Sequence, residues 1–277
     1  MWYNRIMVKH KGFTLIEVSI FLAITGLLLG TILVSTSNSI GQQRFTDAVQ
    51  SFADFLRGVY NTVENPQNVI SDAGGRSDKA LYGRLVTFGE SYDFDGKEAG
   101  NRQLILSYDV IGNVDGRLDG NDILQTLKGR EIDVISKNDD GSPIVNGTQE
   151  SYAPKWGNRI QDITKNGDGN WNDFKGALLV VRSPKSGAIH TFVTREVIDI
   201  NAKIAEWKGP DEIEIHVLSD NSILDTFKKI EVDFCVGSND FFTYNGARQD
   251  IRLNPNAHNS SDIKIIPLDS DDNKCEV

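Results

Sequence analysis

The sequence has few cysteines and few basic residues for its length. Its 277 residues include 2 Cys and 7 Pro, and 29 Lys+Arg stand against 39 Asp+Glu, a formal net charge of −10. Two cysteines exclude a disulfide-dense miniprotein and a zinc module built from several cysteines. The acidic balance argues against binding along a nucleic-acid backbone, because that function normally needs a basic patch. We therefore expect no direct nucleic-acid binding.

Common catalytic motifs are also missing from the sequence. It contains no Gly-rich phosphate loop, no G-x-S-x-G, no H-E-x-x-H and no C-x-x-C. Each of these patterns holds a nucleophile, a metal or a phosphate in a defined turn or helix. Nothing in the sequence therefore favours an enzyme, and we expect none.

A long apolar segment lies close to the N-terminus. Residues 1–12 hold three basic residues and no acid, and residues 13–34 then contain a single charge, Glu17. As a helix this segment would span roughly 33 Å, enough to cross a bilayer. The positive flank predicts that the N-terminus stays in the cytoplasm and the rest lies outside. A single-pass helix in the cytoplasmic membrane is therefore expected.

Glu17 helps to distinguish between the kinds of N-terminal segment that this apolar run could form. A secretory signal peptide has an apolar core of about 7–15 residues, shorter than this one, and rarely carries an acid inside it. A plain membrane anchor fits the length but leaves a carboxylate in the bilayer, at a cost of about 2.5–3.5 kcal/mol or more. Neither interpretation gives Glu17 a role.

Residues 11–18, Lys-Gly-Phe-Thr-Leu-Ile-Glu-Val, resemble the processing site of type IV pilins and pseudopilins. The resemblance covers about residues 9–35. It implies that prepilin peptidase removes residues 1–12 by cutting after Gly12, and that Phe13 becomes N-methylated. It also implies that Glu17 pairs with the N-terminal amine of a neighbouring subunit. Many members have a proline where this chain has Val34, so the resemblance does not extend to the melted helical segment associated with that proline.

The helical pattern continues beyond the apolar segment. From residue 45 to residue 63 apolar residues recur at steps of three and four, which is the spacing of one helical face. Pro66 ends the pattern, since the residue before a proline avoids the α region. We predict one long helix over residues 13–65, with 13–34 as its membrane and assembly part. Phe45, Phe52 and Leu56 are expected to pack on a head formed by residues 66–277.

The head is predicted to be rich in β-strands. Asp-Gly and Asn-Gly pairs, which are strong hairpin signals, separate most of the extended apolar runs. The resulting fold class is α+β and pilin-like: a long N-terminal helix packed on a β-rich head, with long connections over residues 112–175 and 237–261. The expected strands cover residues 80–88, 102–111, 176–182, 188–198, 212–218, 230–236 and 262–267.

Cys235 and Cys275 are the two cysteines of the chain. If the head is exported, its oxidising surroundings would permit a disulfide between them. The resemblance to pilins implies a disulfide-closed C-terminal loop over residues 235–275. Two unpaired thiols remain the alternative.

Two acidic, glycine-containing stretches suggest calcium as a cofactor, and no other cofactor is expected. Calcium takes six to eight oxygen ligands, and alternating side chains in a tight Gly turn can supply them. Both stretches lack the usual first ligand, so ordinary turns on an acidic surface remain the alternative. The candidate ligands are Asn113, Asp115, Asp119 and Asp122 in the first stretch, and Asn166 and Asp168 in the second.

The resemblance implies a structural subunit that assembles with other pilin subunits into a homo- or heteropolymer. It would lie in the cytoplasmic membrane before assembly and in an extracellular or periplasmic filament after processing. Without its leader the chain is larger than most major pilins, which favours a minor or specialised subunit. One alternative is a pseudopilin of a type II secretion or DNA-uptake system. Another is a membrane-anchored or filament-tip adhesin that binds through residues 112–175.

Overall fold

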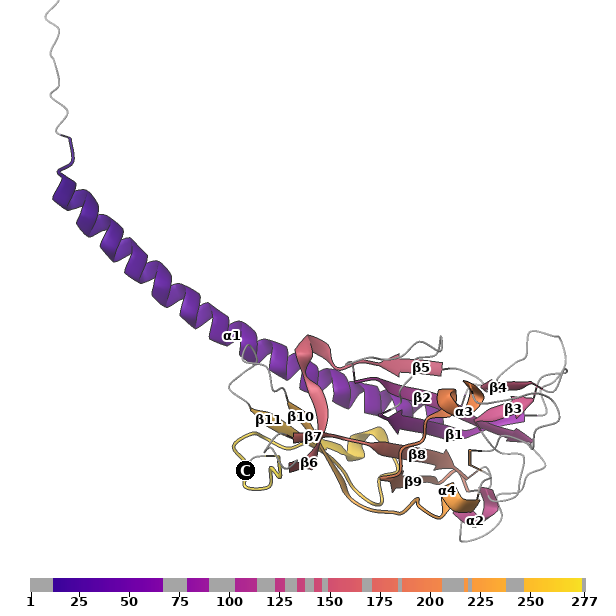
Figure 1. Ribbon diagram of the computed structural model, residues 1–277. Helices are drawn as coiled ribbons and strands as arrows, with labels where there is room; N and C mark the ends of the chain where they lie inside the picture. The colour runs from indigo at the N-terminus through magenta and orange to yellow at the C-terminus, as the bar shows by residue number, and fades with distance from the viewer. Residues whose placement is uncertain are drawn as a thin grey trace, which may run out of the picture. The chain divides into compact units, whose positions relative to one another are not determined.

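The computed structural model divides into two compact units, Met1–Gln43 and Arg44–Val277. Helix α1, Leu15–Glu64, contributes its first part to one unit and its second part to the other (Figure 1). Each unit is described by itself. The structure describes residues 12–66, 79–89, 103–113, 123–127, 134–137, 142–145, 149–165, 171–183, 186–205, 217–218, 221–237 and 247–275.

The first part of α1 is apolar on every side and buries none of it. Phe21, Leu27 and Leu33 are 66%, 70% and 69% exposed, and the other large apolar side chains described here are similar. Threonine hydroxyls on this part bond back to the helix, as Thr25 Oγ1 does by donating to the Phe21 carbonyl at 2.8 Å. The polar groups of these side chains are thereby satisfied within the segment. Such a surface suits an apolar environment and not water.

The second part of α1 is amphipathic and packs on the head. Phe45, Phe52 and Leu56 are buried, as the spacing of apolar residues predicts. Ala53 and Tyr60 widen the buried face, and the Tyr60 hydroxyl lies 2.7 Å from Thr191 Oγ1. Figure 1 shows these turns running along the strands of the head. The helix begins and ends within two residues of the predicted bounds.

Two antiparallel five-stranded sheets form the head. The first has the order β5-β2-β1-β8-β9, and the second has the order β12-β11-β10-β6-β7. The first sheet contains β1 (Lys79–Phe88), β2 (Ile105–Asn113), β5 (Gln149–Tyr152), β8 (Gly176–Arg182) and β9 (Ile189–Thr194). The second contains β6 (Arg159–Lys165), β7 (Trp171–Asp173), β10 (Val232–Gly237), β11 (Arg248–Leu253) and β12 (Ile263–Ile265).

Short elements complete the described part of the head. Strands β3 and β4 pair with each other, and the remaining segments are single helical turns or little more. Their bounds are β3 (Ile135–Lys137), β4 (Pro143–Val145), α2 (Ile123–Leu127), η1 (Lys155–Gly157), α3 (Ile200–Ala205), α4 (Asn221–Leu224) and η3 (Ser260–Asp262).

The first sheet has a hydrophobic core on each face, because successive side chains of a strand point to opposite sides. On one face, Phe88 joins an aromatic cluster beneath α1, with its ring 4.9 Å from Phe174 and 5.4 Å from Phe234 between centroids. Phe52 of α1 stands edge-on to Phe234 at 5.5 Å. On the other face, Leu85 belongs to a second core to which α2, α3 and α4 each contribute buried side chains.

The strand predictions are confirmed in outline and corrected in two places. Six of the predicted runs are strands, and they correspond to β1, β2, β8, β9, β10 and β12. Most of the seventh run, residues 212–218, lies outside the described residues, and its last two residues, Val217 and Leu218, form a bend. The expectation of long connections over 112–175 and 237–261 was wrong, since they contain β3 to β7 and β11. These strands are short or polar, and β5, at a sheet edge, buries neither Glu150 nor Ser151. Apolar runs therefore could not reveal them.

We predict that Phe52→Ala destabilises the mature chain by about 3–5 kcal/mol, because it removes a fully buried ring from the aromatic cluster and leaves a cavity. Urea unfolding in detergent solution measures the effect. Asn61→Ala, on the exposed face of the same helix, is the matched control and should change stability by less than about 0.5 kcal/mol. Equal effects of the two substitutions would contradict the packing described here.

Candidate processing and assembly site

The predicted cleavage point lies in exposed, non-helical backbone just before α1. Gly12, Phe13 and Thr14 have no regular secondary structure, and Phe13 is 87% exposed. No heavy atom lies within 4 Å of the place where a Cβ on Gly12 would stand. A larger side chain at this position therefore meets no obstacle within the described part of the chain. Any effect of such a substitution on cleavage would arise from the peptidase.

Glu17 forms a capping box with Thr14 at the start of α1. The Thr14 backbone N–H and hydroxyl both donate to Glu17 Oε2, at 2.8 and 3.0 Å, and the Glu17 N–H donates to Thr14 Oγ1 at 3.2 Å. This reciprocal pattern satisfies backbone donors that the first turn of a helix leaves open. Glu17 thus has a partner within its own chain, and its pairing with another subunit stays a prediction.

Thr14 is the residue that sequence reasoning missed at this site. Its signal was present, because Thr14 and Glu17 stand at the Ser/Thr-x-x-Glu spacing that precedes many helices. The carboxylate remains exposed in the structure, so the capping bonds do not remove it from contact with a second chain.

Beyond Glu17, α1 is long and apolar enough to cross a membrane. Its most apolar window has a mean hydropathy of 2.3, and none of that window is buried within the structure. By length and composition this is consistent with membrane anchoring before assembly. The Gly12–Phe13 bond, the capped start of the helix and the apolar helix thus follow one another directly along the chain.

The comparisons with known proteins agree with this arrangement. A family model described as the prokaryotic N-terminal methylation motif matches residues 7–33. The chain carries this motif. The match includes Gly12, Phe13 and Glu17, and it supports a type IV pilin or pseudopilin type of precursor. No curated protein and no solved structure was found to match the chain.

At the other end of the chain, a disulfide joins Cys235 of β10 to Cys275, 40 residues later. Both cysteines are buried. This is the pairing that the resemblance to pilins implies, in place of two unpaired thiols. It ties the C-terminal segment to a central strand of the second sheet.

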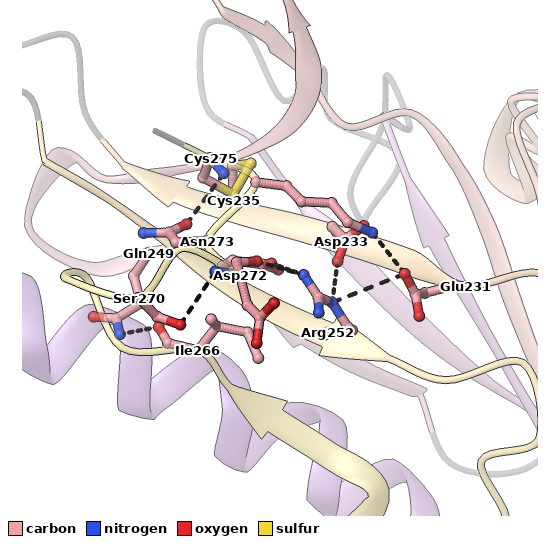
Figure 2. A network of polar contacts seen from close by, with 12 residues as sticks. Glu231, Asp233, Cys235, Gln249, Arg252, Ile266, Ser270, Asp272, Asn273 and Cys275 are labelled. Carbon is pink, nitrogen blue, oxygen red and sulfur yellow. Dashed lines mark hydrogen bonds and ion pairs between the residues drawn. A yellow bond between two sulfur atoms is a disulfide. The ribbon is translucent and has the colours of Figure 1, made fainter. Parts of the chain in front are cut away.

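Ion pairs hold the C-terminal segment beside this disulfide (Figure 2). Arg252 of β11 donates from Nε to Asp233 Oδ1 at 2.6 Å and from Nη2 to Asp250 Oδ2 at 2.8 Å. The same Nη2 donates to the Asp272 carbonyl at 2.8 Å, and Lys274 Nζ donates to Asp233 Oδ2 at 2.9 Å. The segment is therefore bound to β10 and β11 by charge as well as by the covalent bond.

Asn273 adds neutral contacts to the same segment. It is buried, and its Nδ2 donates to the Arg248 carbonyl at 3.2 Å, while the Cys275 N–H donates to Asn273 Oδ1 at 3.1 Å. A short segment with this many fixed contacts is ordered in spite of its position near the terminus.

The two carboxylates of this network have opposite pKa shifts. Burial and, to a smaller extent, the charge of Asp233 together raise the pKa of Asp250 to about 6 against the opposing effect of Arg252. Burial would also raise the pKa of Asp233, but hydrogen bonds from Lys274 and Arg252 outweigh it and hold this pKa below its usual value. Asp250 therefore takes up a proton first as the pH falls.

The calcium prediction concerns residues that the structure does not describe. Asp115, Asp119, Asp122, Asn166 and Asp168 lie outside the described residues, and Asn113 is described only as the last residue of β2. Among the described residues no group of three or more His, Cys, Asp or Glu side chains could hold a metal ion. Calcium binding by these stretches stays a prediction.

We predict that Asp250→Asn flattens the pH dependence of stability between pH 7 and pH 4. The folded-state pKa of Asp250 lies above the unfolded value of about 3.9. The folded chain therefore binds more protons in this window, and its stability rises as the pH falls. The lowered pKa of Asp233 has the opposite effect, and the stability that it contributes is lost only as the pH falls below its unfolded value of about 3.9.

Urea unfolding of the mature chain at pH 7 and pH 5 tests this prediction. When the pH falls from 7 to 5, the free energy of unfolding should rise by on the order of 1 kcal/mol more for wild type than for Asp250→Asn. Asp269→Asn, at an exposed position, should behave as wild type. Parallel pH profiles for wild type and Asp250→Asn would show that the buried carboxylate does not titrate in this range.

Proposed function

We propose that this chain is a structural subunit of a type IV pilus-like filament, cut by prepilin peptidase after Gly12 and assembled through the first part of α1. The observation that carries the proposal is the N-terminal methylation motif over residues 7–33, followed without a break by an exposed apolar helix. The motif supports processing and methylation of Phe13. The apolar helix supports burial against other helices once the chain leaves the membrane.

Charge pairing at Glu17 provides the register of this assembly. Cleavage creates a positively charged amine on Phe13, and Glu17 of a neighbouring subunit carries the opposite charge. Two charges about 4 Å apart attract far more strongly in an apolar environment than in water. An unpaired carboxylate in such surroundings is costly, so helices aligned to form the pair are favoured over other alignments.

A pseudopilin of a secretion or DNA-uptake system is the second candidate, and the same motif favours it equally. Both kinds of subunit would be cleaved at Gly12 and would assemble through α1. They differ in where the filament lies. A pilus subunit appears in material sheared from the cell surface, and a pseudopilin stays with the envelope.

We predict that Gly12→Val blocks cleavage. The structure leaves room for the new side chain, so the block would reflect the peptidase and not misfolding. The mobility of the chain on a denaturing gel separates precursor from mature protein. Normal processing and assembly of this variant would rule out the proposed function.

Two substitutions of Glu17 separate its charge from its capping role. Glu17→Gln keeps an oxygen that can accept from the Thr14 N–H, whereas Glu17→Ala removes both the charge and the cap. We predict that both variants are cleaved and that both assemble poorly, because neither can pair with an amine. If Glu17→Gln assembles like wild type and only Glu17→Ala fails, the cap and not the charge pair is what assembly requires.

A further inference from the structure

Trp156 has an unusual backbone conformation in the connection between β5 and β6. Its φ and ψ are 61° and 31°, and it is the one non-glycine residue with positive φ among those the structure describes. A bulky residue in the left-handed region is strained, and such strain persists where the surrounding structure enforces it, often at binding sites. A role in binding would therefore explain why Trp156 keeps this strained conformation.

Trp156 is also exposed and accompanied by positive charge. Its side chain is 52% exposed, and the Arg44 guanidinium carbon lies 5.1 Å from the ring centroid. Arg44 and Lys155 are both exposed, and neither forms an ion pair with any described residue. Trp and Arg are the residue types most enriched at interface hot spots. We call Arg44, Lys155 and Trp156 the Trp156 patch.

The C-terminal segment presents the opposite charge on an ordered turn. Asp269, Asp271 and Asp272 are all exposed, and within the described residues their carboxylates make no ion pair. The backbone between them is fixed, because the Ser270 N–H bonds to the Pro267 carbonyl at 3.1 Å. Figure 2 shows this segment held beside the disulfide by Arg252 and Asn273. We call residues 267–274 the acidic turn.

We propose that the Trp156 patch of one copy of the chain binds the acidic turn of a second copy. The two surfaces are complementary in charge, and complementarity of this kind selects partners and fixes register. The acidic turn is ordered before contact by the disulfide and ion pairs, so less conformational freedom is lost on binding.

A contact between two different surfaces of identical chains does not close on itself. Such heterologous contacts generate rings or open helical filaments, according to the rotation between subunits. The inference therefore rests on the proposed function, and it adds a contact between heads to the packing of apolar helices.

Reversing the charges of the Trp156 patch and of the acidic turn, and measuring the yield of filaments from cells, tests the proposal. Arg44→Glu with Lys155→Glu, and separately Asp271→Lys with Asp272→Lys, should each lower the yield of sheared filaments about tenfold, because like charges then face each other. The four substitutions together should restore the yield. Lys264→Glu, at an exposed position of β12, is the matched control and should assemble normally. Undiminished yields from both pairs, or failure of the combined variant while each pair still folds, would overturn the proposal.

A photo-crosslinking residue in place of Trp156 identifies the partner directly. Cross-links from full-length chains in filaments should map to residues 267–274 of a second copy. Cross-links only to another protein, or only to other parts of the second copy, would contradict the proposal. If wild-type chains form no filaments at all, the proposed function fails first, and cross-linking of the chains in the membrane still decides whether this contact forms.

Trp156→Gly distinguishes a binding role from a structural one. Glycine adopts positive φ without strain, so the melting temperature should not fall, whereas the filament yield should. An undiminished yield for Trp156→Gly, whatever its melting temperature, would show that the exposed ring does not contribute to assembly.

Discussion

The apolar surface on the first part of α1 constrains everything else in this molecule. Large side chains such as Leu27 and Leu33 are two-thirds exposed there, and water cannot be their final environment. A helix satisfies its own backbone hydrogen bonds, so the same segment fits a bilayer and a bundle of helices equally well. The proposed assembly adds a partner for the exposed carboxylate of Glu17, which in the separate chain accepts hydrogen bonds from Thr14.

The second part of the same helix contributes buried side chains to the core of the head. Phe52 lies where the aromatic rings of both sheets meet, and Tyr60 reaches Thr191 in β9. One face of the second part of α1 therefore forms part of the core of the head. The C-terminal segment is secured separately, by Cys275 and by the ion pairs of Arg252. The C-terminal segment thus has a fixed position on the head.

The sequence predicts the long helix and the β-rich head well, because apolar residues recur at steps of three and four and then in extended runs. It does not predict β6 or β11. Gln161 and Asp250 are buried in these strands, where polar residues are not expected. Gln161 accepts a hydrogen bond from Arg248, which lies 87 residues later, and Asp250 accepts one from Arg252, two residues later in the same strand. The positive φ of Trp156 has no sequence signal, since bulky residues rarely adopt the left-handed region. Thr14 could have been predicted from the capping-box spacing.

The most direct test of this account is the intact mass and N-terminal sequence of the protein from sheared surface filaments. The account predicts a chain that starts at methylated Phe13 and is about 2 Da lighter than its reduced form, as one disulfide requires. A chain recovered only from membranes, still starting at Met1, would contradict it. That result would leave an anchored protein whose head faces outward and whose apolar helix never leaves the bilayer.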